Sequence, residues 1–156
     1  MGHQLTEELT SRIFKTGVVA VLVIDRVVDA VPLAHALLKG GIDIMEVTLR
    51  TPAALESIVE IREQVPEMVA GAGTVLTPEQ AQAVKDAGAH FGVAPGLNAD
   101  VLRMADEIDL PFSPGIVTPS DVEAGIALGC KTLKFFPAEP SGGLTYLKSM
   151  AAPYAH

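Results

Sequence analysis

Cysteines, clustered basic residues and metal-ligand spacings are scarce in this chain of 156 residues, and each scarcity excludes a class of protein. The single cysteine, Cys130, excludes an internal disulfide framework and fits a reducing compartment. The 11 lysines and arginines are spread among 19 acidic residues, so neither nucleic acid nor an anionic membrane surface is an expected partner. No second histidine or cysteine lies at metal-ligand spacing from His35 or His90, so we expect no metal site.

Long hydrophobic runs are also missing. The longest, residues 18–24, is far too short to span a bilayer, and the N-terminal segment carries acids, unlike a signal peptide. A cytoplasmic protein is therefore the default expectation. With 49% hydrophobic residues and no linker or low-complexity tract, residues 1–156 are expected to form one compact domain with a substantial core.

Strand-like and helix-like segments alternate along the chain. Apolar and β-branched runs, typical of strands covered on both faces, predict strands at residues 18–24, 42–49, 69–72, 90–94, 111–113 and 132–136. Helical spacing of apolar residues predicts a lead-in helix at 5–15 and further helices at 25–39, 52–64, 78–87, 99–108, 119–128 and 144–151. The lead-in helix is thus followed by six strand–helix units.

The ends of these helices repeat the same local chemistry. Several predicted helices begin with an N-cap threonine and a proline at the first helical position, at 51–52, 77–78 and 118–119. Several end on glycine just before a strand, which supplies a left-handed residue without a Cβ penalty, at 40–41, 88 and 129. Units of roughly 20 to 25 residues that share these helix-start and helix-end residues indicate repeated βα modules.

Consecutive parallel crossovers favour a (β/α) barrel over an open doubly wound sheet. A dinucleotide-binding sheet usually has a glycine-rich turn after its first strand, whereas residues 25–28 contain no glycine. In a barrel, the chemistry is found at the C-terminal ends of the strands. Those ends carry polar residues and Pro-Gly turns, namely Glu46 with Arg50, Gly73-Thr74, Pro95-Gly96, Pro114-Gly115 and Lys134.

Lys134 is the only charged residue in the apolar segment 132–138. Because burying an ammonium group is costly, such a position favours the neutral amine, a nucleophile that can form a Schiff base with a ketone. Glu46 follows Ile42 and Ile44 on one strand face, so a carboxylate and an amine are expected to converge inside the barrel. Alternatively, Lys134 is an edge-strand lysine that prevents strand pairing, or the two residues form only a structural ion pair.

The strand-end motifs resemble those of one enzyme family. They are Glu46-Val47-Thr48-Leu49-Arg50-Thr51, Gly71-Ala72-Gly73-Thr74-Val75, Pro95-Gly96, Ser113-Pro114-Gly115 and Lys134-Phe135-Phe136-Pro137-Ala138-Glu139. In this order and spacing they strongly resemble the 2-keto-3-deoxy-6-phosphogluconate (KDPG) aldolases and the related 4-hydroxy-2-oxoglutarate (KHG) aldolases. The resemblance implies a class I aldolase without metal or other cofactor, on a TIM (β/α)8 barrel and usually homotrimeric. Such an enzyme cleaves KDPG to pyruvate and glyceraldehyde 3-phosphate.

The resemblance also implies roles for single residues. Lys134 would be the Schiff-base lysine and Glu46 the general acid and base. Arg50 and Thr74 would bind the carboxylate of the small-molecule keto-acid substrate. The pocket would be walled by Phe136 and by the turn of Pro95 and Gly96. Alternatively, Arg50 is a solvated loop residue and Thr74 only caps a turn.

The resemblance stops after the sixth strand–helix unit, around Pro153, whereas the family continues through two more units. Those units contain the glycine-rich loops that bind the substrate phosphate. We therefore expect residues 1–156 to be part of a longer barrel, or to need another chain that covers the gap. Three functions are open: KDPG cleavage in the Entner-Doudoroff pathway, KHG cleavage to pyruvate and glyoxylate, and a non-catalytic truncated relative.

Overall fold

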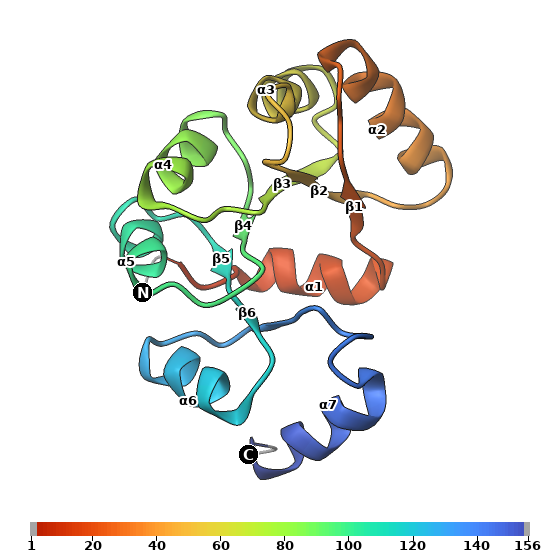
Figure 1. The fold of residues 1–156 in the computed structure, drawn as a ribbon. Coiled ribbons are helices and arrows are strands. Elements are labelled where there is room, and N and C mark those ends of the chain that lie inside the picture. The colour runs from red at the N-terminus through yellow and green to blue at the C-terminus, as the bar shows by residue number, and fades with distance from the viewer. Residues whose placement is uncertain (1–2, 155–156) are drawn as a thin grey trace.

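Parallel strands and the helices that follow them curve around a common centre in the computed structural model, which describes residues 3–154 (Figure 1). The strands are β1 (Ala20–Leu22), β2 (Ile44–Thr48), β3 (Val69–Gly73), β4 (Gly92–Val93), β5 (Phe112–Ser113), β6 (Gly115–Ile116) and β7 (Lys134–Phe135). The α-helices are α1 (Glu7–Thr16), α2 (Ala30–Lys39), α3 (Ala54–Gln64), α4 (Pro78–Asp86), α5 (Ala99–Glu107), α6 (Pro119–Ala127) and α7 (Gly143–Ala151). Short 3-10 turns, η1 (Val27–Asp29) and η2 (Ala152–Tyr154), precede α2 and follow α7.

All strand pairs run parallel, as the alternation of strands and helices predicts. The order in the larger sheet is β1-β2-β3-β4-β5, and β6 pairs with β7 in a second sheet. This is the arrangement of a TIM-barrel-like α/β fold. The register places Glu46 between Val21 of β1 and Gly71 of β3.

The sequence predicts a single strand at 111–113, whereas the structure has β5 and β6 on either side of Pro114. Proline has no backbone N–H, so the ladder is interrupted at that residue. The Pro114 carbonyl still accepts a hydrogen bond from the Lys134 N–H at 2.9 Å. The fifth strand segment therefore pairs with β4 through its first half and with β7 through its second half.

The two faces of the curved sheet have different partners. Residues such as Met45 and Ala70 point outward and belong to the large core between strands and helices. Ile44 and Val69, at the N-terminal ends of β2 and β3, point inward and pack against Leu9 of α1. Helix α1 therefore covers the N-terminal end of the interior and leaves the C-terminal strand ends for the site.

The helix caps follow the sequence prediction with one correction. Thr77 and Thr118 form capping boxes at the starts of α4 and α6, each with a proline at the first turn. Thr51 was expected to cap α3 in the same way, but that helix begins later, with Ala53 as its N-cap. The Thr51 hydroxyl instead donates to the Ile24 carbonyl at 2.5 Å and thereby joins the loops that follow β1 and β2.

The glycines at the helix ends adopt the expected left-handed conformation. Gly41, Gly88 and Gly129 have φ angles of 82°, 76° and 83°. Each follows the C-cap residue of its helix and turns the chain toward the next strand.

The strand pairing does not close into a ring within residues 3–154. Strand β1 pairs with β2 and strand β7 with β6, and no pairing joins β1 to β7 in this part of the chain. Val21 of β1, Val23 just after that strand and Phe14 of α1 are exposed. Over the same residues, no helix is long and apolar enough to cross a membrane.

Candidate active site

Lys134 and Glu46, which are 88 positions apart in the sequence, meet at the inner face of the sheet. The lysine Nζ lies 3.1 Å from Glu46 Oε1 and 3.0 Å from Oε2. The Glu46 side chain is 6% exposed and that of Lys134 is 26% exposed. The amine therefore reaches solvent, while the carboxylate is almost enclosed, and the expected convergence of the two groups is present.

These two side chains form part of a pocket of about 290 Å³. Its lining also includes four other residues singled out from the sequence, Arg50, Thr74, Pro95 and Phe136. Gly96 is not among the lining residues and lies against Gly115, whose N–H donates to the Gly96 carbonyl at 3.3 Å. Gly96 is thus a contact of the β6 strand rather than a wall of the pocket.

Backbone turns at the strand ends direct Arg50 and Thr74 into this pocket. The Arg50 N–H donates to the Thr48 carbonyl at 2.7 Å, which turns the chain sharply after β2. Thr74 follows β3 directly and has a φ of 61°, a left-handed conformation that is strained for a β-branched residue. Strain of this kind costs about 1–3 kcal/mol and occurs preferentially at functional sites.

An aromatic side chain covers one side of the amine. The Lys134 Nζ lies 5.3 Å from the centroid of the Phe136 ring, within the range of a cation–π interaction. The ring follows β7 and remains partly exposed to solvent. The ring therefore shields the amine on one side.

Two further lining residues, Thr48 and Val21, were not singled out from the sequence. Thr48 is buried, and its hydroxyl donates to the Leu22 carbonyl at 2.9 Å, which joins β2 to β1. The alternation Ile44, Glu46, Thr48 along one strand face was the available signal for Thr48. No sequence signal distinguished Val21 from the other valines of its strand.

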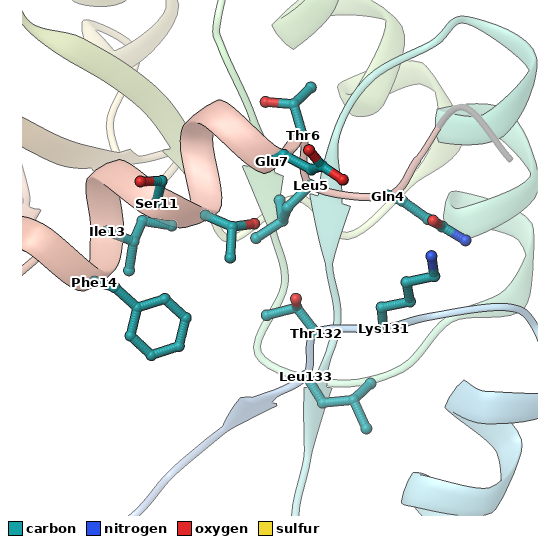
Figure 2. Close-up of a pocket in the computed structure, with 11 residues that line it drawn as sticks. Gln4, Leu5, Thr6, Glu7, Ser11, Ile13, Phe14, Lys131, Thr132 and Leu133 are labelled. Atoms are coloured by element: carbon teal, nitrogen blue, oxygen red, sulfur yellow. The ribbon is translucent and has the colours of Figure 1, made fainter.

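A larger cavity of about 1060 Å³ lies between α1, with the residues just before it, and the Lys131–Leu133 segment (Figure 2). Figure 2 shows Ile13 and Phe14 projecting from α1 on one side and Thr132 and Leu133 on the other. The lysine–carboxylate pair lies in the smaller pocket, so cavity size does not identify the site here.

His90, Cys130 and His35 lie outside the pocket that contains Lys134 and Glu46. His90 Nδ1 lies 3.1 Å from the Ala70 N–H, and burial lowers the His90 pKa below its usual value, with a smaller contribution from Arg62. Burial also raises the pKa of the Cys130 thiol, which disfavours a reactive thiolate. His35 is exposed on α2. Within residues 3–154, no group of three or more His, Cys, Asp or Glu side chains is arranged to hold a metal ion.

Fold and site together define a parallel α/β protein with an inward-facing lysine–carboxylate pair in a pocket that residues at the C-terminal strand ends complete. A family model described as KDPG and KHG aldolase matches residues 9–156 of the chain. This chain therefore belongs to the KDPG and KHG aldolase family, whose members are lyases.

Similar proteins agree with this family. The KHG/KDPG aldolase of Escherichia coli K12 is 46% identical over 144 residues, covering 92% of this chain and 68% of the relative. The KDPG aldolase of Zymomonas mobilis ZM4, solved with 3-phosphoglycerate, superposes with a TM-score of 0.88 at 46% identity, covering 93% of this chain and 69% of that one. The Legionella pneumophila KDPG aldolase, solved with pyruvate captured as a covalent carbinolamine, has a TM-score of 0.82 at 40% identity, over 85% and 65% of the two chains.

Proposed function

We propose that this chain is a class I aldolase that cleaves KDPG to pyruvate and glyceraldehyde 3-phosphate through a Schiff base on Lys134. The observation that carries the proposal is the contact of the Lys134 amine with both carboxylate oxygens of Glu46, at 3.1 and 3.0 Å, inside a pocket that also contains Arg50. The aldolase names of the relatives support the same reaction class.

The pair supplies both groups that Schiff-base chemistry needs. Glu46 accepts a proton from the Lys134 ammonium, and the resulting amine attacks the C2 ketone of the substrate. Glu46 returns a proton to the carbinolamine hydroxyl, and loss of water leaves an iminium on Lys134. The iminium accepts the electron pair of the breaking C3–C4 bond, while Glu46 takes the proton of the C4 hydroxyl. The enamine that remains is protonated at C3 and hydrolysed to pyruvate.

The other lining residues fit the binding of a keto acid. The Arg50 guanidinium can grip a carboxylate with two parallel hydrogen bonds, and the Thr74 hydroxyl can donate a third. Phe136 and Pro95 add apolar walls to the pocket. The carbinolamine of pyruvate in the Legionella pneumophila enzyme supports an amine-based mechanism for its relatives.

A second candidate activity is cleavage of 4-hydroxy-2-oxoglutarate to pyruvate and glyoxylate. The family description names both aldolases, and this substrate has no phosphate to bind. Among the residues that line the described pocket, the cations are Arg50 and Lys134, and the mechanism uses both for the keto-acid end. The pocket as described therefore fits the unphosphorylated substrate as well.

Rates of pyruvate release from the two substrates, measured on the full chain, test these activities. We expect release from at least one substrate, and a rate on the order of 10³-fold lower in Lys134→Met, which lacks the nucleophile. The substrate with the higher kcat/KM identifies the activity. No release from either substrate would contradict both and favour a non-catalytic relative.

The oligomeric state, the cellular compartment and the pathway are also proposals. We infer a cytoplasmic homotrimer in the Entner-Doudoroff pathway, as the family resemblance implies. The unpaired edges of β1 and β7 support two further strand–helix units, from this chain or from another, that complete the barrel. Sedimentation equilibrium tests the trimer, and a monomeric mass at all concentrations would contradict it.

A further inference from the structure

Gly73, the last residue of β3, lies directly against the Glu46 side chain. A Cβ atom at this position would overlap Glu46 Oε1 and would lie 2.6 Å from Cδ and 2.7 Å from Cγ. Real Cβ atoms essentially never approach another heavy atom closer than 3.0 Å. Any side chain at position 73 would therefore displace the carboxylate of Glu46.

The lack of space beside the Glu46 side chain, and not a special backbone conformation, is the reason that residue 73 is a glycine. In the described part of the chain, the glycines with positive φ angles are Gly17, Gly41, Gly88, Gly129, Gly142 and Gly143. Gly73 is instead a regular strand residue whose Cα pairs with Thr48 of β2. An alanine can adopt this backbone without strain, so the cost of a Cβ there falls on Glu46.

We propose that Gly73 is a positioning residue for the lyase reaction, which lets the Glu46 carboxylate lie within hydrogen-bond reach of the Lys134 amine. This inference rests on the proposed Schiff-base function. Both carboxylate oxygens contact the Lys134 Nζ, so a shift of about 1 Å lengthens both contacts. Proton transfer to and from the substrate then slows, because a general base must be within hydrogen-bond distance of the proton it removes.

The variant Gly73→Ala separates the positioning of Glu46 from the reactivity of Lys134. Borohydride reduction with pyruvate measures imine formation by the amine. Exchange of the pyruvate methyl protons with solvent deuterium, followed by NMR, measures proton removal from C3 of the bound imine. Because displacement of Glu46 also slows imine formation, trapping is carried to its end point, where its extent depends on the amine alone. We expect Gly73→Ala to reach the same final extent of trapped adduct within about twofold and to slow the exchange on the order of 10²-fold.

Gly71→Ala is the matched control on the same strand and face. The three atoms nearest to a Cβ at Gly71 all belong to the ring of Phe91, at 2.3 to 2.5 Å, whereas those nearest to a Cβ at Gly73 all belong to Glu46. We expect it to lower stability while leaving the ratio of exchange to trapping unchanged. An equal loss of exchange in both variants would overturn the proposal, because the effect would then follow from packing alone.

The double variant Glu46→Ala/Gly73→Ala shows whether the two positions act through one contact. If Gly73→Ala unfolds because its Cβ overlaps the glutamate, removal of the Glu46 side chain restores a circular-dichroism spectrum and melting temperature close to those of Glu46→Ala. A double variant that remains unfolded would overturn the proposal. The proposal also requires that Gly73→Ala has no further effect on exchange once Glu46 is alanine.

Different results would contradict the proposed Schiff-base function and the proposed role of Gly73. If the unsubstituted chain forms no pyruvyl adduct, the proposed Schiff-base function is wrong and the positioning role falls with it. If the unsubstituted chain forms the adduct and exchanges protons, and Gly73→Ala exchanges them equally fast, only the role of Gly73 is wrong.

Discussion

The buried carboxylate of Glu46 depends on the Lys134 ammonium for compensation of its charge. Removal of the lysine leaves a carboxylate with a 6% exposed side chain beside apolar strands, whereas removal of the carboxylate leaves an amine that already reaches water. We therefore expect Lys134→Met to lower the free energy of unfolding by about 1–3 kcal/mol, and by more than Glu46→Gln does. Urea unfolding of the two variants checks this order. The reverse order would show that the carboxylate is better solvated than its burial indicates.

Protonation of His90 provides a second prediction at the residue scale. Burial lowers its pKa in the folded state, so the unfolded chain binds the proton more readily. The stability from the neutral ring is present above its usual pKa of about 6.5 and is lost as the pH falls through the lower folded value. We expect the melting temperature to fall as the pH drops below about 6.5, and to fall less in His90→Asn.

His35→Asn is the control for that experiment, because His35 is exposed on α2. It is expected to retain the pH dependence of the unsubstituted chain. If His35→Asn flattens the profile as much as His90→Asn does, the assignment to His90 is wrong.

Single site residues were predictable where they interrupted a regular pattern. Lys134 is a charge within an apolar strand and Glu46 is a charge within a β-branched one, and both project inward as the alternation along each strand requires. Thr51 was assigned wrongly as a helix cap from a local motif. Its position depends on a contact with Ile24, which is distant in the sequence.

At the scale of elements, the capping box at the start of α6 fixes the boundary between β6 and that helix. One oxygen of Asp121 accepts hydrogen bonds from the Thr118 and Val117 N–H groups, at 2.8 and 3.0 Å. These bonds, with that of Thr118 first, hold the pKa of Asp121 below its usual value. Its stabilising effect is therefore present above the usual pKa of about 3.9 and is lost as the pH falls through the lower folded value.

We expect Asp121→Ala to cost about 1 kcal/mol of stability at neutral pH and much less at a pH below the folded pKa of Asp121. Urea unfolding at both pH values measures the difference. Ser120→Ala, an exposed change in the same turn, is the control and is expected to have little effect. An equal loss at both pH values would contradict the role of the carboxylate.

Helices were predicted more accurately than strands, for a physical reason. Most helix ends are determined by local chemistry, such as the threonine cap of α4 and the left-handed Gly88 after it. Strand ends are determined by pairing with a neighbour, which depends on residues far away in the sequence. Strand β7, predicted at 132–136, accordingly spans only Lys134–Phe135.

At the scale of the whole molecule, the unpaired edge of β1 is the part of the described chain that most favours association. An unpaired parallel edge with exposed valines is a template for association with another chain. We expect the average mass to rise with concentration in sedimentation velocity experiments, and Val21→Lys, within β1, to reduce that rise. Val28→Lys is the control, because Val28 is 71% exposed but lies on η1, outside the strand. Equal effects of the two substitutions would contradict a role for the edge.

The parallel topology and the positions of the two catalytic candidates were predictable because the unit repeats along the chain. The count of six units also predicted a barrel with a gap, but not which strands pair with the free edges of β1 and β7. Among residues 3–154, that pairing is absent.

The central claim is that the Lys134 amine reacts with the ketone of a keto acid. Incubation of the folded chain with pyruvate and borohydride, followed by peptide mass mapping, tests it directly. The other lysines, Lys15, Lys39, Lys85, Lys131 and Lys148, serve as internal controls in the same sample. We predict a reduced pyruvyl adduct on the peptide that contains Lys134, and its loss in Lys134→Met. No adduct, or an adduct spread over the other lysines, would contradict the claim.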